Sequence, residues 1–398
     1  MTGALVAQLL PSFPAPTLTV LAIPELLDEI LTHVSASGPE IFRARSLCAC
    51  ALVSRSWTAI AQHHLFSQLE LVAQRSTNLS LIHTLTASPQ LAAHVRHLSV
   101  ATPALPLRVP RLQSLAVVSD PWIPSPPIEG IQHIIRASST TLRTIKFAGS
   151  FYMDTLAAIL SPSSLQNIEN VDISGVISWF VKDKFISEDE MDESKPPPLR
   201  NRCVLKPRHI SLSKQISAQL TNHHHLQSVG LGLERLTSLS ISPLIVNYLL
   251  ASPLNEFLWA RLHFLEVSDI FAGTDIFLEP VLNQATALRT LQVRVINAAE
   301  LEEAVLLLGA TNSAHLHTFA LRCLFSDWVE SWPQIYSALA ALDDKLTWLP
   351  TGHPLRKVEL LISRDAEGFS NLAGLLCAAI PSAPNRGITV EVWTIFAE

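Results

Sequence analysis

A short pattern of apolar positions recurs along most of the chain and predicts its architecture. From Phe66 onward, apolar residues stand at the first, fourth and sixth positions of each copy. The clearest copies begin at Leu236, Leu262, Leu288 and Leu316, so their starting points lie 26, 26 and 28 residues apart. Because side chains alternate between the two faces of a strand, the fourth and sixth positions share one face. Each copy therefore predicts one short strand with a buried side.

Helical stretches separate these predicted strands. Segments such as IEGIQHIIRASS (128–139) and AAELEEAVLLLG (298–309) carry apolar residues at the spacing of one helix face. One strand and one helix per unit, at this period, are typical of leucine-rich repeats. We therefore expect an α/β fold over residues 67–398, an irregular solenoid with a parallel sheet inside an arc and helices outside it.

The first seventy residues follow a different pattern. Prolines crowd residues 1–20, which we expect to form a flexible lead-in. Residues 21–66 predict three short helices, and Pro24 suits the first turn of the first helix. A unit of this size buries its own apolar surface poorly, so it should have a binding partner.

Two insertions lengthen the repeats. Residues 182–198 hold a run of acidic side chains followed by three prolines, and we expect a disordered surface loop there. The second insertion holds three of the eight tryptophans, Trp328, Trp332 and Trp348. These indoles either fill the edge of the core along a longer helix or contact a partner protein.

A set of residues between 21 and 72 carries a family resemblance. The set comprises Ile23-Pro24-Glu25, Leu27, Ile30-Leu31, Leu47, Leu52-Val53-Ser54, Trp57 and Leu65-Phe66. It resembles the F-box in the form common among fungal proteins, although the link SASGPEIFRAR (35–45) is longer and less apolar than the family's short form. The rest of the chain resembles the degenerate leucine-rich arrays that often follow an F-box.

The resemblance implies a substrate-recognition subunit of a Skp–cullin–F-box ubiquitin ligase, which is not itself an enzyme. The three helices would bind a Skp-type adaptor on a cullin scaffold, and the arc would hold a target protein. The residues expected to bind the adaptor are Pro24, Leu27, Ile30, Leu31, Leu52 and Trp57. Trp57 could instead only close the small helical core. The alternative function is a scaffold protein that keeps the adaptor without ubiquitin transfer.

The target surface is expected where strand residues alternate with the buried pair. Two rows then point out of the concave side: Ser240, Glu266, Gln292 and Ala320, and beside them Ser242, Ser268, Arg294 and Arg322. The candidate target-binding residues are Phe264, Glu266, Gln292, Arg294 and Arg322. Neighbouring parallel strands lie about 4.8 Å apart, so the two arginines should form a basic pair that favours an acidic or phosphorylated target. The alternative is that both are solvated or pair with acids such as Glu266.

Composition and charge narrow the functional classes. The chain has 28 Lys and Arg against 34 Asp and Glu, a net charge of -6, which argues against nucleic-acid binding. No apolar run reaches the roughly 18 residues of a membrane helix, and the N-terminus does not resemble a signal peptide. Five cysteines without C-x-x-C spacing indicate reduced thiols, hence a cytoplasmic or nuclear protein.

Motifs for catalysis are weak. Residues 211–214 match S-x-x-K but lack the companion motifs, and residues 230–232 lack the third glycine of a dinucleotide loop. The three histidines at 223–225 favour a solvated helix end over a metal site. A hydrolase is a further hypothesis, but no G-x-S-x-G nucleophile motif occurs. We expect no cofactor and no metal.

Overall fold

The computed structural model describes most of the chain, in segments separated by gaps. The described residues are 23–36, 40–71, 76–101, 107–119, 128–160, 165–178, 205–212, 231–243, 258–311, 313–325, 328–350, 352–363 and 372–395. The expected lead-in (1–20) and the expected acidic loop (182–198) both lie outside them.

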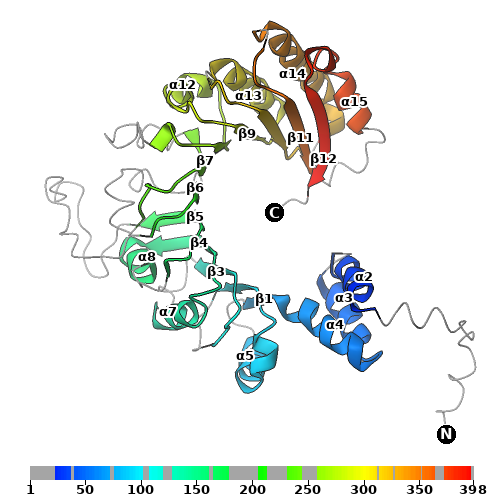
Figure 1. Cartoon of the computed structure of the whole chain (residues 1–398), viewed down its shortest axis with the longest axis vertical. Coiled ribbons are helices and arrows are strands. Elements are labelled where there is room, and N and C mark those ends of the chain that lie inside the picture. The colour runs from blue at the N-terminus through cyan, green and yellow to red at the C-terminus, as the bar shows by residue number, and fades with distance from the viewer. Residues whose placement is uncertain are drawn as a thin grey trace, which may run out of the picture.

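Three helices form a small unit near the N-terminus (Figure 1). They are α2 (Pro24–Ala36), α3 (Glu40–Ala51) and α4 (Arg55–Ser67). Pro24 begins α2, where its missing N–H removes no intrahelical bond. Ser54 caps α4 by accepting a 3.4 Å hydrogen bond from the backbone nitrogen of Trp57. The starts of α2 and α4 thus follow ordinary helix-start chemistry.

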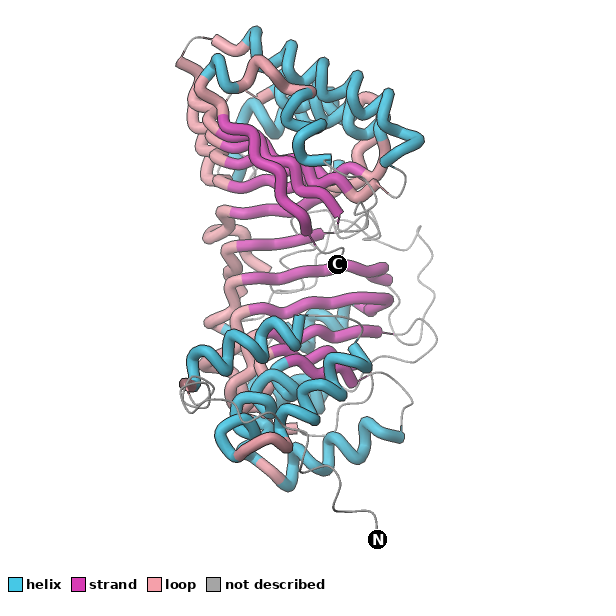
Figure 2. The backbone as a smooth tube through the Cα atoms, turned by 90° about the vertical axis from the view of Figure 1, so that its right-hand side faces the viewer, coloured by secondary structure: helices cyan, strands magenta, loops and turns pink. Residues whose placement is uncertain are grey.

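Twelve parallel strands form one open sheet, in which each strand lies beside the next along the chain. They are β1 (Gln68–Leu71), β2 (His97–Val100), β3 (Ser114–Ser119), β4 (Thr144–Tyr152), β5 (Asn170–Ser178), β6 (His209–Leu212), β7 (Ser238–Ile241), β8 (Phe264–Val267), β9 (Thr290–Val295), β10 (Thr318–Cys323), β11 (Lys357–Ser363) and β12 (Thr389–Ile395). Figure 1 shows that the sheet curves into an arc, and Figure 2 shows its strands stacked like rungs.

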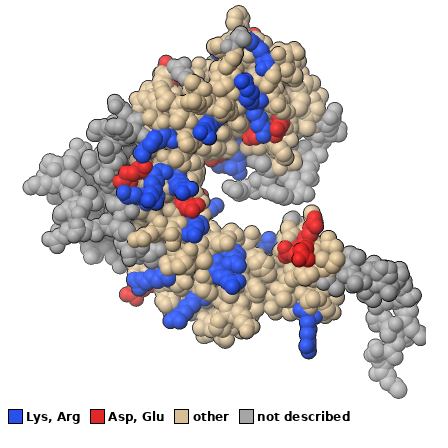
Figure 3. Space-filling view, in the orientation of Figure 1, with Lys and Arg blue, Asp and Glu red and all other residues tan. Residues whose placement is uncertain are grey.

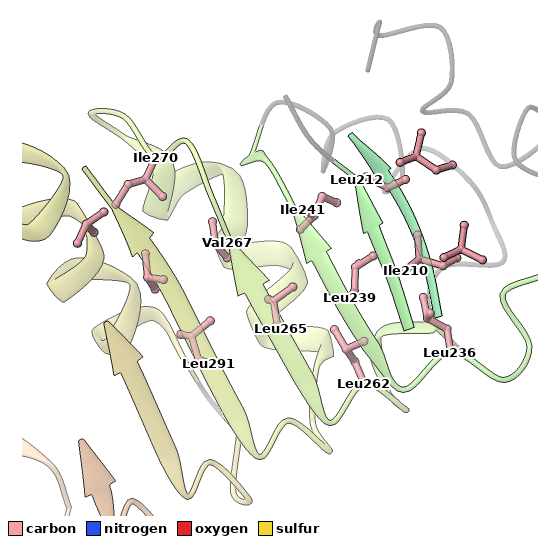
Figure 4. Close-up of a cluster of buried hydrophobic side chains, with 14 of the residues drawn as sticks. Ile210, Leu212, Leu236, Leu239, Ile241, Leu262, Leu265, Val267, Ile270 and Leu291 are labelled. Atoms are coloured by element: carbon pink, nitrogen blue, oxygen red, sulfur yellow. The ribbon is translucent and has the colours of Figure 1, made fainter. Parts of the chain in front are cut away.

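The core lies between the sheet and the helices outside it. Along neighbouring strands, side chains at equivalent positions are buried, as for Leu265 beside Leu291 and Val267 beside Val293. Figure 4 shows these rows pointing to one side of the sheet. Each unit therefore buries its apolar face only against its neighbours, as expected for a solenoid-like array.

Helices return the chain on the outer side of the arc (Figure 1). The described helices after β1 are α5 (Ser76–Ala87), α6 (Pro89–Ala92), α7 (Ile128–Ala137), α8 (Met153–Leu160), α12 (Thr274–Gln284), α13 (Ala298–Ala310), α14 (Trp328–Trp348) and α15 (Leu372–Ala378), with the short 3-10 helix η5 (Pro384–Arg386). Asn297 caps α13 by accepting a 2.9 Å hydrogen bond from the nitrogen of Glu300. No described helix combines the length and apolar character needed to cross a bilayer.

The helical unit joins the sheet without a spacer, because α4 ends at Ser67 and β1 begins at Gln68. The carbonyl of Ser67 accepts a 2.9 Å hydrogen bond from the nitrogen of Arg96, which precedes β2. The ring of His63 on α4 lies 5.6 Å from the ring of His94. These contacts hold α4 against the first units of the sheet.

The strands follow the repeat pattern, except in the last unit. That pattern places Ile388 and Val390 at its fourth and sixth positions. The observed register pairs Val358 with Val390 and Leu360 with Val392, so the last strand is shifted by two residues. The reason is an added turn: η5 precedes Gly387, whose φ of 70° is a left-handed conformation that favours glycine.

Candidate interaction surfaces

The helical unit has its own small core. Leu27, Leu31, Leu47 and Ala61 are buried there, and Trp57 packs against them half-buried. Asp28 on α2 and His64 on α4 are joined by a contact of 2.8 Å between Oδ1 and Nε2. Two of the expected adaptor residues, Leu27 and Leu31, therefore support the unit from inside.

Three of the other expected adaptor residues lie on the outside of the unit, whereas Trp57 is half-buried. Pro24 is exposed, Ile30 is 40% exposed and Leu52 is 88% exposed. Further exposed apolar side chains that the sequence reasoning left out of the site are Ile23, Leu26, Phe42 and Val53. Ile23 and Val53 belong to the F-box-like pattern, which could have indicated them; Phe42 lies in the atypical link and carried no such signal.

The turn between α3 and α4 presents two of these side chains on fixed backbone. The nitrogens of Leu52 and Val53 donate hydrogen bonds of 3.1 Å to the carbonyls of Ala49 and Cys50. The hydroxyl of Thr58 donates a 2.6 Å hydrogen bond to the carbonyl of Ala51. This turn can therefore offer apolar contact area at a small entropic cost.

The structure brings the five expected target-binding residues together on three neighbouring strands. Phe264 and Glu266 lie on β8, Gln292 and Arg294 on β9, and Arg322 on β10. Arg294 and Arg322 are partners in the parallel register, as the repeat spacing predicts. Arg294 is exposed and forms no ion pair with a described carboxylate, whereas Arg322 lies 4.0 Å from Glu266. The alternative pairing with Glu266 is thus observed for one of the two arginines.

Some of the expected surface positions are covered. Ser240 is 9% exposed, and Ala320 and Ser242 are fully buried. Ser240 and Ala320 do occupy the expected row, in register with Glu266 and Gln292. Their short side chains do not reach past the longer neighbouring side chains. Whether a position on the concave face is exposed therefore depends on the length of its side chain.

The concave surface continues onto the last two strands, which the sequence reasoning missed. Leu361 and Trp393 follow Arg294 and Arg322 in the same row of the register. Trp393 is 54% exposed, and its Nε1 donates a 3.0 Å hydrogen bond to Glu391. The signal existed in the sequence, but the two-residue error in the register of the last unit concealed it.

A charged cluster lies beside Trp393. Nζ of Lys357 is 2.6 Å from Glu359 and 2.8 Å from Glu391. Hydrogen bonds to Glu359 and Glu391 raise the pKa of Lys357, and the hydrogen bond from Lys357 lowers the pKa of Glu391. The hydrogen bond from Trp393 to Glu391 joins the indole to this cluster.

The tryptophans of the second insertion differ in burial. Trp332 is half-buried and packs against the main core, while Trp348 is 79% exposed at the end of α14. The side chain of Trp328 lies outside the part of the structure that can be described. The longer helix is present, because α14 spans 21 residues.

Reactive groups are sparse in the described segments. No group of three or more His, Cys, Asp or Glu side chains there is arranged to hold a metal ion. Cys323 is buried, and burial raises its thiol pKa to about 12, which makes it a poor nucleophile. Ser211 lies on β6, but Lys214 and the histidines at 223–225 fall outside the described residues. No family model and no curated protein sequence matches the chain.

Proposed function

We propose that this chain is the substrate-recognition subunit of a Skp–cullin–F-box ubiquitin ligase, working in the cytoplasm or nucleus. In this proposal α2, α3 and α4 form an F-box that binds a Skp-type adaptor. The twelve-stranded arc is a degenerate leucine-rich-repeat solenoid that binds the target protein. The chain performs no bond chemistry itself; it raises the effective concentration of the target and orients it.

One observation carries the proposal: the helical unit exposes apolar side chains that its own core does not use. Leu52 and Val53 are 88% and 63% exposed on the hydrogen-bonded turn between α3 and α4. Exposed apolar side chains grouped on a small unit favour a protein interface. They also belong to the pattern that resembles the F-box.

The junction with the sheet supports a positioning role. Because α4 continues directly into β1, an adaptor bound to the helices would be held at a fixed orientation to the concave surface. A flexible linker would lose that orientation and reduce the effective concentration of the target.

The proposal predicts direct binding of a purified Skp-type adaptor, measured by isothermal titration calorimetry. A charge at the turn, Leu52→Asp, should weaken binding by at least tenfold, because a desolvated carboxylate would lie in an apolar contact. The matched control is Leu79→Asp on α5, where the leucine is 55% exposed outside the helical unit. Equal adaptor affinity for both variants and the parent protein would refute the assignment of this surface.

The alternative is a scaffold that keeps the adaptor without ubiquitin transfer. Both functions use the same helical surface, so the calorimetry does not separate them. Co-purification does: recovery of adaptor together with cullin favours the ligase subunit, and recovery of adaptor alone favours the scaffold.

A further inference from the structure

Cationic side chains gather along one edge of the sheet. All strands are parallel, so the turns that lead into them lie on the same edge, a column of loops beside the strands in Figure 2. We call the described turn residues preceding β2 to β12 the turn edge; they are 93–96, 110–113, 138–143, 165–169, 205–208, 231–237, 258–263, 285–289, 313–317, 352–356 and 380–388. Its Lys and Arg residues are Arg96, Arg111, Arg143, Lys206, Arg208, Arg235, Arg261, Arg289, Arg356 and Arg386.

Only two carboxylates, Glu169 and Glu234, stand among these turn-edge residues. The whole chain has a net charge of -6, so the excess of positive charge along the turn edge is opposite in sign to the charge of the chain as a whole. Figure 3 shows Lys and Arg side chains spaced along the arc. A linear array of one sign creates a field that attracts an extended ligand of the opposite sign.

Several of these arginines are fixed by backbone carbonyls of a neighbouring turn. Nη1 of Arg96 donates to the carbonyl of Arg111 at 3.1 Å, and Nη1 of Arg261 donates to the carbonyl of Glu234 at 2.7 Å. A carbonyl positions the guanidinium but does not neutralise its charge. Since a guanidinium has five N–H donors, Arg96 keeps donors for a ligand.

The positive charge is densest around a hollow formed by the turns that precede β6, β7 and β8. The hollow has a volume of about 460 Å³ and is lined by Arg208, Arg235 and Arg261, together with Glu234. The carboxylate of Glu234 lies 3.5 Å from Nζ of Lys206. Two of the lining cations, Arg208 and Arg235, form no ion pair with a described residue.

The arrangement fits a polypeptide better than a nucleic acid. A phosphodiester backbone carries a charge at every unit and would meet Glu169 and Glu234, whereas a polypeptide can place neutral or basic residues opposite them. A duplex is stiff, with a persistence length of about 50 nm, and touches only part of an arc. Single-stranded binding uses exposed aromatic platforms, and no Phe, Tyr or Trp side chain is exposed among the described turn-edge residues.

We propose that the turn edge binds an extended acidic segment of a partner protein, with the Arg208–Arg235–Arg261 hollow at its centre. The arginine forks would bind carboxylates with paired, charge-assisted hydrogen bonds. The hollow shares no lining residue with the concave rows or with the helical unit. The inference therefore holds or fails independently of adaptor binding and ubiquitin transfer.

The test uses a fluorescein-labelled oligoglutamate peptide and fluorescence anisotropy with the full chain. We expect salt-sensitive binding that Arg208→Gln with Arg235→Gln weakens on the order of tenfold, through the lost charge-assisted contacts. Both side chains are exposed and donate to no turn carbonyl, so the variant should fold, which circular dichroism checks. A charge-matched control on α3, Arg43→Gln with Arg45→Gln, should change the affinity less than twofold.

A conservative variant tests the fork geometry. Arg208→Lys with Arg235→Lys keeps the charge but loses the paired donors, and should bind with intermediate affinity. The proposal is overturned if the glutamine variant binds the peptide as the parent does. It is also overturned if duplex DNA, or vesicles of phosphatidylserine and phosphatidylcholine, bind more tightly than the peptide at equal salt and lose that binding in the glutamine variant.

Discussion

The carboxylate of Glu266 on β8 lies 4.0 Å from the guanidinium of Arg322 on β10, across the intervening strand β9. The same carboxylate accepts a 2.9 Å hydrogen bond from Gln292 on β9. The two charged side chains are only 17% and 19% exposed, so solvent screens them weakly. Three neighbouring strands are thus linked on the concave side, and Arg294 presents the more accessible positive charge.

We predict that Glu266→Gln lowers the free energy of unfolding by about 1 kcal/mol, because a half-buried arginine loses its counter-charge. Urea denaturation measures this change. The matched control is Glu234→Gln, which removes an exposed pair with Lys206 and should change stability by less than about 0.5 kcal/mol. Equal effects of the two substitutions would contradict the link across β9.

Charge reversal on the concave side should abolish target capture. The double variant Arg294→Glu, Arg322→Glu is expected to lose the captured proteins while keeping the adaptor, and Arg294→Glu alone should cause most of that loss, because Arg322 is already paired. Quantitative mass spectrometry of affinity-purified material measures both. Capture of the same targets by the double variant would remove these strands from the target site.

Gly149 should be indispensable to the sheet. Its φ is 99°, and a Cβ there would overlap the carbonyl oxygen of Ser119 on β3. Gly149→Ala therefore combines backbone strain of about 1 kcal/mol with a collision against backbone that does not yield. Gly352→Ala is the control, because φ is 88° there but a Cβ would meet nothing within 4 Å. The first variant should unfold at clearly lower urea concentration than the second; similar midpoints would be inconsistent with this geometry.

The junction between α4 and the sheet should weaken in acid. Burial, aided by nearby cationic groups, lowers the pKa of His63 and of His94 below their ordinary value near 6.5. The unfolded chain then binds protons more readily than the folded chain, so stability falls as pH drops below about 6.5. Melting temperatures measured from about pH 7.5 to pH 5 should fall less steeply for His63→Gln with His94→Gln than for the parent. Parallel curves would exclude the pair as a source of acid sensitivity.

Much of the sheet could be predicted because its rule is local. Apolar residues at the fourth and sixth positions face the core in the units before the last one, as with Leu265 and Val267. The rule failed at the last strand, where an added turn at η5 moved the register and hid Trp393. The burial of Leu27 and Leu31 in the small helical core could not be predicted from the sequence either. Helical spacing defines an apolar face, but it does not show which part of that face another helix covers.

The surface chemistry was less predictable for a different reason. The pairing of Glu266 with Arg322 depends on two strands that are far apart in the sequence and on the side chain between them. The turn edge is likewise invisible as a sequence motif, because its arginines are separated by whole repeats. Only the parallel register, applied to every unit at once, brings them into one line.

The central claim is that the exposed turn of the helical unit binds a Skp-type adaptor within a cullin complex. The most direct measurement is affinity purification of the tagged chain from cells, with adaptor and cullin quantified by mass spectrometry. We expect the parent protein and the Leu79→Asp control to recover both proteins, and Leu52→Asp to lose both while still folding. Recovery of neither protein by the parent, or undiminished recovery by Leu52→Asp, would contradict the account.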